Sequence, residues 1–241
     1  MSIKRSIENL LRDYPVLFRF GSRVYHWFNN SFKTLSPGTP EAILGAFELL
    51  HKEGRDPFGD YYEFGLFRGY AFLKAFEHSE QLGLNTIQFH GFDSFKGLPA
   101  AEGIDTADGR FFEGQFACSR ADVEKNLAAN GMDMSRALLV EGFYEDSLTD
   151  ELHDEHNFNP AAVVLLDCDY YSSTVEALKW VDRYLVDGTI LLFDDWYSYG
   201  DDDQLGQPKA FEEFLDSHPN VSAEHLWRFS HNGNAYRLKV A

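Results

Sequence analysis

The chain has 241 residues, of which 44% are hydrophobic and 16% aromatic, and this composition is typical of a folded globular domain. Its 39 acidic and 21 basic side chains give a formal net charge of −18 at pH 7, so nucleic acids and anionic membrane surfaces are not expected as partners. No apolar run approaches the roughly 20 residues of a membrane span, and the charged N-terminus does not resemble a signal peptide, which favours a cytoplasmic protein.

The N-terminal part of the chain is expected to be helical. Apolar residues recur at helical spacing over residues 3–11, and Thr39 and Pro40 suit the N-cap and the first position of a later helix. We therefore predict two parts, an N-terminal helical extension or lid over residues 1–55 and a main domain over residues 56–241.

Short strand patterns alternate with helix patterns through the main domain. The expected strands lie at residues 61–64, 86–92, 137–140, 161–166 and 189–193, with two more near the C-terminus. This alternation predicts an α/β fold with a doubly wound, mostly parallel, seven-stranded sheet. The Asn232-Gly233 pair predicts that the last two strands form an antiparallel hairpin at one edge.

Acidic residues stand at the ends of the expected parallel strands. They are Glu63, Asp93, Glu141, Asp167 and Asp194. Ligands of such sheets bind beyond the carboxyl ends of the strands, so we expect the functional site at this edge.

The turn that contains Glu63 and Gly65 joins the first strand of the main domain to a helix. It lacks the glycines that bring a backbone against a pyrophosphate, and it suits a cofactor with an ammonium group and no phosphate. Asp93 ends the next strand, where a carboxylate can accept both ribose hydroxyls of a cofactor. Two alternatives stay open: Gly65 serves only the dihedral angles of the turn, and Asp93 caps the turn that follows it.

Asp167 and Asp169 follow one buried strand, and Asp194 and Asp195 follow the next. Neighbouring parallel strands end at the same edge, and a group of carboxylates there suits a hard cation such as Mg²⁺, which eases loss of a proton from a bound hydroxyl. Asp167 and Asp169 are the candidate catalytic residues, since Asp169 or the metal itself can remove this proton. Helix capping by these aspartates is the alternative, and Asp201–Asp203 are assigned to a solvated surface or a mobile lid.

Several segments resemble the macrocin O-methyltransferase family, class I methyltransferases that methylate sugar hydroxyls. They are residues 63–69, 92–99, 141–148, 166–174 and 194–196. The specific ones are Phe-Asp-Ser-Phe-x-Gly-Leu-Pro from Phe92 and Leu-Asp-x-Asp-x-Tyr-x-Ser-Thr from Leu166. The resemblance implies an S-adenosylmethionine-dependent O-methyltransferase that acts on the hydroxyl of a small molecule, and it implies a homodimer.

The resemblance also implies which residues hold the ligands. The cofactor contacts would be Glu63, Gly65, Asp93, Ser94 and Gly142. The Mg²⁺ ligands would be Asp167, Asp194 and Asp195. Tyr70 departs from the family, which usually has a second glycine there, and this leaves the geometry of the turn open.

Three other functions are compatible with parts of the sequence. Asp167-Cys168-Asp169 is also a D-x-D pattern of metal-dependent glycosyltransferases, although that function leaves Glu63, Gly65 and Asp93 unexplained. A nicotinamide oxidoreductase has a similar sheet, but its pyrophosphate glycines are missing. The third alternative is a non-catalytic acidic binding module. The acceptor and the general base are not identified by the sequence.

Overall fold

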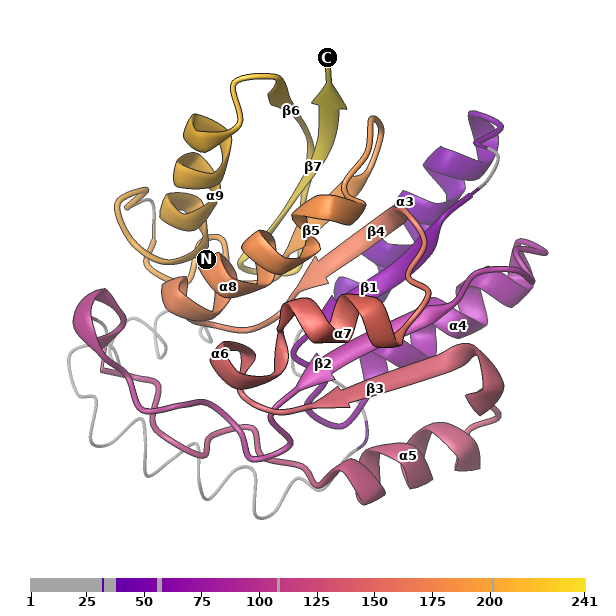
Figure 1. Ribbon diagram of the computed structural model, residues 1–241, viewed down its shortest axis with the longest axis horizontal. Coiled ribbons are helices and arrows are strands. Elements are labelled where there is room, and N and C mark those ends of the chain that lie inside the picture. The colour runs from indigo at the N-terminus through magenta and orange to yellow at the C-terminus, as the bar shows by residue number, and fades with distance from the viewer. Residues whose placement is uncertain (1–31, 33–37, 56–57, 108, 201) are drawn as a thin grey trace.

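The structure is a computed structural model that describes residues 32, 38–55, 58–107, 109–200 and 202–241. A seven-stranded sheet lies at its centre, with helices on both faces (Figure 1). The strands are β1 (Asp60–Phe64), β2 (Phe89–Asp93), β3 (Ala137–Glu141), β4 (Ala161–Leu166), β5 (Ile190–Phe193), β6 (Val221–Phe229) and β7 (Gly233–Val240).

The order of the strands is β3-β2-β1-β4-β5-β7-β6. β1 to β5 pair in parallel, whereas β7 pairs antiparallel with both β5 and β6. The predicted α/β sheet with its antiparallel C-terminal hairpin is therefore confirmed.

Helices connect the strands and cover the sheet. The α-helices are α3 (Thr39–Lys52), α4 (Tyr70–Gln81), α5 (Arg120–Ala129), α6 (Tyr144–Ser147), α7 (Asp150–Glu155), α8 (Tyr171–Val181) and α9 (Gly206–Ser217). The 3₁₀ helices are η1 (Gly103–Thr106), η2 (Met134–Arg136) and η3 (Asp182–Tyr184). None of the described helices is long and apolar enough to cross a membrane.

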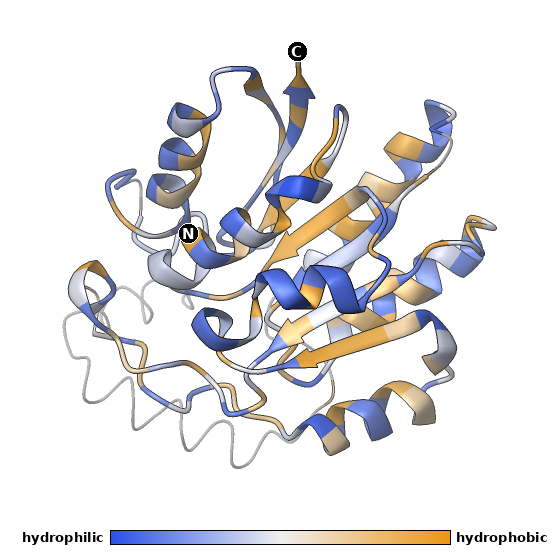
Figure 2. Cartoon of the chain, viewed as in Figure 1, coloured by the Kyte–Doolittle hydropathy of each residue, from blue (hydrophilic) through white to orange (hydrophobic). Residues whose placement is uncertain are grey.

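Two hydrophobic cores lie on opposite faces of the sheet. Side chains of α3, α4 and α5 form one core, and those of α7, α8 and α9 contribute to the other. Figure 1 shows α7 and α8 in front of the sheet and α3 behind it. The strand β4 is buried along its whole length because both of its faces are covered, and Figure 2 shows it as hydrophobic throughout. Successive residues alternate between the cores, so that Tyr61 of β1 packs into the first and Tyr62 into the second.

Helix α3 belongs to the first core. Its Phe47 lies 6.0 Å from the ring of Tyr61 in an edge-to-face arrangement, and both rings are fully buried. The predicted boundary at residue 55 assigns this helix to the extension, and most of that extension lies outside the described residues. The division of the chain at this point therefore stays a prediction.

Candidate functional site

The acids at the carboxyl ends of β1, β4 and β5 lie at one edge of the sheet. The N–H of Asp167 donates to the carbonyl oxygen of Phe64 on β1 at 2.9 Å, and the N–H of Asp194 donates to that of Leu166 on β4 at 3.0 Å. These bonds bring the ends of the neighbouring strands to the same level. The sheet thus places the strand-end acids side by side, as the sequence predicts.

The carboxylate of Asp167 lies in a strongly negative environment. It is partly exposed, yet the surrounding protein raises its pKa well above the ordinary value through desolvation. The charges of Asp194, Asp195 and Asp169, and then that of Glu63, raise this pKa further. A cation at this edge would relieve the repulsion among these groups.

Asp194 and Asp195 are held by side chains and main chain from other elements. They are only 4% and 8% exposed. The hydroxyl of Thr39 on α3 donates to Oδ1 of Asp194 at 2.5 Å. Asp195 accepts from the Ser198 hydroxyl on Oδ1 and from the backbone N–H of Asp169 on Oδ2, both at 3.1 Å. Burial raises the pKa of Asp195, and the neighbouring charge of Asp194 adds to the shift.

The described residues contain no group of three or more His, Cys, Asp or Glu side chains arranged to hold a metal ion. The ligand set of Asp167, Asp194 and Asp195 is therefore not preassembled. In donor chemistry the edge does fit a hard cation, because it offers carboxylate oxygens that repel one another. Each carboxylate oxygen of Asp195 can accept a second interaction beside the hydrogen bond that it already makes.

Gly65 is required by a close approach of two strand ends. Its φ is 93°, and a Cβ atom here would lie 1.8 Å from the carbonyl oxygen of Asp167. No other residue type fits without moving one of these strands. The structural role of Gly65, which the sequence left as an alternative, is thus sufficient to explain it.

Asp93 organises the turns around it. Its Oδ2 accepts the backbone N–H groups of Leu66 and Phe67 at 2.7 and 3.1 Å, and its Oδ1 accepts that of Phe95 at 2.6 Å. This geometry is the capping arrangement that the sequence kept as an alternative. It fills both lone pairs of Oδ2 and leaves capacity on Oδ1 for one ribose hydroxyl rather than two.

Glu63 is buried on the face of the sheet that α3 and α4 cover. Only 1% of the residue is exposed, and its Oε2 accepts the hydroxyl of Tyr61 at 2.6 Å. Burial raises the pKa of Glu63 to about 8, against the lowering effect of the Tyr61 bond and the Phe72 backbone N–H. Glu63 is therefore largely protonated at neutral pH unless a cation comes close.

The two remaining residues of the implied cofactor set lie near Asp93. Ser94 follows it directly, and its hydroxyl donates to the carbonyl oxygen of Gly97 at 2.7 Å. The N–H of Gly142, at the end of β3, donates to the carbonyl oxygen of Asp93 at 3.0 Å. The structure thus places Asp93, Ser94 and Gly142 together at one side of the carboxyl edge.

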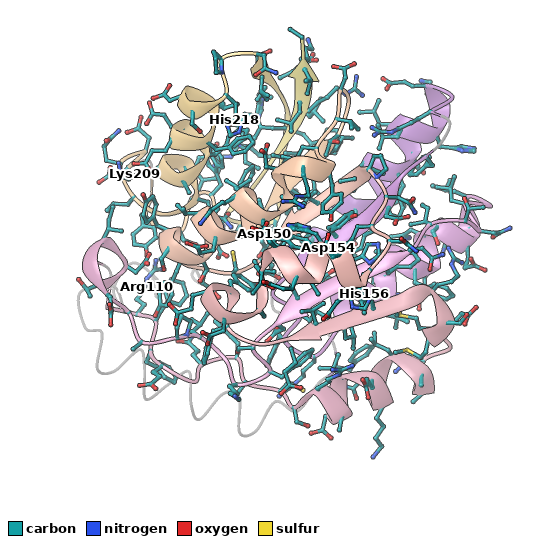
Figure 3. The ribbon with its side chains drawn as sticks, viewed as in Figure 1. Arg110, Asp150, Asp154, His156, Lys209 and His218 are labelled. Carbon is teal, nitrogen blue, oxygen red and sulfur yellow. The ribbon has the colours of Figure 1, made fainter. Side chains whose placement is uncertain are left out.

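Other residues of this edge carry no local sequence signal. Gln207 of α9 is fully buried, accepts the backbone N–H of Asp195 and donates to the carbonyl oxygen of Leu166, each at 2.9 Å. Arg110 donates to the carbonyl oxygen of Ser198 and lowers the pKa of Asp195. Figure 3 labels Arg110 on the side where the parallel strands end. Only the fold brings these residues to the acids: Arg110 lies before β3 in the chain, and Gln207 reaches Asp195 and Leu166 from helix α9.

Solved structures share this fold. The O-methyltransferase NovP has a TM-score of 0.72 at 18% identity, over 88% of this chain and 84% of that one. The calicheamicin methyltransferase CalS11 has a TM-score of 0.64 at 22% identity, over 80% of this chain and 77% of that one. TomG of Streptomyces achromogenes, solved with S-adenosylmethionine, has a TM-score of 0.56 at 15% identity over 100% of both chains. At these identities the likeness establishes the class I methyltransferase fold.

Comparison of the sequence with known families is more specific than comparison of the folds. No curated protein matches the chain. The profile of the macrocin O-methyltransferase (TylF) family matches residues 50–218, which is more than half of the chain and includes β1 to β5 with the acids at their carboxyl ends. The chain therefore belongs to the macrocin O-methyltransferase family and is an S-adenosylmethionine-dependent O-methyltransferase.

Proposed function

We propose that the enzyme methylates a hydroxyl of a sugar or of a glycosylated natural product, in a reaction that depends on Mg²⁺ held by Asp167, Asp194 and Asp195. The family supports a small-molecule hydroxyl as acceptor. A second structure of CalS11, in its apo form, is that of a TDP-rhamnose 3′-O-methyltransferase and has a TM-score of 0.55 at 21% identity over 80% of this chain and 78% of that one. A sugar hydroxyl is not acidic enough to react at neutral pH without activation, which a bound divalent cation supplies by lowering its pKa.

The observation that carries the metal proposal is the crowding of acids around Asp167. Four carboxyl groups act on its pKa in the raising direction, and Asp194 is itself almost fully buried. Buried carboxylates of like charge are unfavourable unless protons or a cation neutralise them. In this proposal Asp167, Asp194 and Asp195 would hold the cation as ionised carboxylates, and Asp169 would accept the proton of the acceptor hydroxyl.

The cofactor half of the site comprises Glu63, Gly65, Asp93, Ser94 and Gly142. The buried Glu63 would ionise next to a positively charged cofactor, because a nearby cation favours the carboxylate over the acid. The single remaining lone pair of Asp93 Oδ1 suits one ribose hydroxyl. Gly65 would contribute the shape of the turn rather than a bond.

The test is binding and turnover with matched variants. Isothermal titration of S-adenosylhomocysteine, a nucleotide sugar and NAD, each with and without Mg²⁺, should give strong binding for the first, whereas strong binding of only the nucleotide sugar or NAD would contradict the proposal. Asp194→Ala should lower Mg²⁺-dependent turnover by at least about a hundredfold and change cofactor affinity little. Asp202→Ala, which removes an exposed acid of the following loop, is the control and should retain turnover. Normal turnover of Asp194→Ala would refute the metal role.

Three further proposals come from the sequence alone. They are a homodimer, a cytoplasmic location, and an N-terminal extension over residues 1–55 that shapes the acceptor site. Molecular mass in solution tests the first. Deletion of residues 1–31 tests the third, because it should raise the KM for the acceptor more than that for the cofactor.

A further inference from the structure

The segment between β2 and α5 forms a loop with a closed neck. The N–H of Leu98 donates to the carbonyl oxygen of Gln115, and the N–H of Gly114 donates to that of Leu98, both at 2.9 Å. Gly97, with a φ of 84°, lies so close that a Cβ atom would stand 2.4 Å from the oxygen of Gln115. We name this segment the 98–115 loop, of which residue 108 is not described. These hydrogen bonds fix the two ends of the loop, so other contacts must hold its middle in place.

Asp105 supplies this anchor on α8. Its carboxylate accepts the backbone N–H of Tyr171 on Oδ1 at 2.7 Å and that of Ser172 on Oδ2 at 3.2 Å. These are first-turn N–H groups of α8, whose own N-cap residue Tyr170 makes no side-chain cap. Asp105 is only 4% exposed. A residue distant in sequence therefore caps the helix.

The capped end of α8 lies next to the catalytic acids. The helix begins directly after the Asp167–Tyr170 segment, so a cap on its first turn also fixes the chain that carries Asp167 and Asp169. The ring of Phe111 in the 98–115 loop packs edge-on against Tyr170, at 5.6 Å between centroids. The loop thus contacts both the helix and the segment that leads into it.

Arg110 connects the same loop to the neighbouring acids. Its Nη2 donates to the carbonyl oxygen of Ser198, and the Ser198 hydroxyl donates to Oδ1 of Asp195 at 3.1 Å. The guanidinium is close enough to Asp195 to act on it electrostatically. The 98–115 loop is therefore anchored at two places along the acidic edge: Asp105 bonds to the first turn of α8, and Arg110 bonds to the turn after β5.

We propose that Asp105 is a positioning residue for methyl transfer, which caps α8 and thereby holds the 98–115 loop across the acidic edge with Arg110 beside Ser198 and Asp195. The inference rests on the proposed function, because it takes this edge as the reaction site. The loop then forms a wall of the acceptor site. Without the cap, Arg110 loses its fixed position, although the sheet and its cores remain.

Trypsin provides a direct test, because Arg110 is the one lysine or arginine between Leu98 and Gln115. Cleavage after Arg110 in the native protein should be slow and should become at least about tenfold faster in Asp105→Ala, as expected for loss of a helix cap. Asp105→Asn should be intermediate, since an amide oxygen can accept one of the two N–H groups. Asp133→Ala is the matched control: it removes an exposed aspartate cap from η2, and cleavage after Arg110 should not change.

Kinetics separate positioning from simple stabilisation. Asp105→Ala should raise the KM for the acceptor by about tenfold and leave the affinity for S-adenosylhomocysteine within about threefold of wild type. Unchanged cleavage after Arg110, or cleavage that accelerates equally at all sites, would show that Asp105 is only a structural cap and would overturn the inference. The proteolysis does not depend on enzymatic activity, so the two proposals can fail separately. Absence of methyl transfer in the wild-type protein would contradict the proposed function, whereas the rate of cleavage after Arg110 would still test the role of Asp105 in holding the loop.

Discussion

Replacing Glu63 with glutamine tests whether this buried acid carries a proton in the folded enzyme. Burial raises its pKa from 4.5 to about 8. Because the folded protein then binds the proton more tightly than the unfolded chain, this group stabilises the fold at low pH, and the contribution is lost as the pH rises from 4.5 toward 8. At about 1.36 kcal/mol per pH unit, the loss between roughly pH 5.5 and 8 amounts to about 3 kcal/mol.

Urea unfolding of wild type and Glu63→Gln at these two pH values measures the effect. Glutamine keeps an acceptor for the Tyr61 hydroxyl and does not ionise, so the variant should gain about 3 kcal/mol relative to wild type over this range. Glu141→Gln, which removes an exposed carboxylate at the end of β3, should show no such gain. A difference between wild type and Glu63→Gln that is the same at both pH values would refute the reasoning.

Two other substitutions test the packing of the acidic edge. Gly65→Ala should destabilise the protein by at least about 3 kcal/mol in thermal unfolding, because the added Cβ would collide with a backbone carbonyl. Gly54→Ala is the control and should cost only about 1 kcal/mol, because Gly54 has a similar φ of 72° but open space around it. Thr39→Val should cost about 1 to 3 kcal/mol because it removes the hydroxyl that donates to the buried Asp194, and Thr39→Ser should restore most of this loss; equal stability of the Val and Ser variants would contradict that role.

The sheet could be predicted because its signals are local. The apolar run of β4 and the Asn-Gly turn between β6 and β7 each specify one element without distant partners. The strand boundaries differ from the prediction at one point: the strand expected at 86–92 is β2 at Phe89–Asp93. Gln88 donates its N–H to the carboxylate of Asp60 at 3.0 Å, although its carbonyl oxygen still accepts the N–H of Tyr61 on β1, so a side chain replaces only one of the two backbone bonds there.

The convergence of the acids could also be predicted, because parallel strands bring their carboxyl ends to one edge. The hydrogen-bond partners of these acids could not be predicted. Thr39 was expected to cap its helix, but the N-cap is Gly38, and the Thr39 hydroxyl donates instead to Asp194, 155 positions away. A long-range bond of this kind leaves no periodic pattern in the sequence. The same holds for the bonds of Asp105 to α8.

The central claim is that Asp167, Asp194 and Asp195 hold a divalent cation beside the methyl donor. The most direct measurement is an anomalous difference map from crystals grown with Mn²⁺, as a substitute for Mg²⁺, and S-adenosylhomocysteine. We expect one peak within about 2.3 Å of carboxylate oxygens from at least two of these aspartates, next to the cofactor. Bound S-adenosylhomocysteine with no peak at this edge, or with the aspartates turned away from one another, would contradict the account.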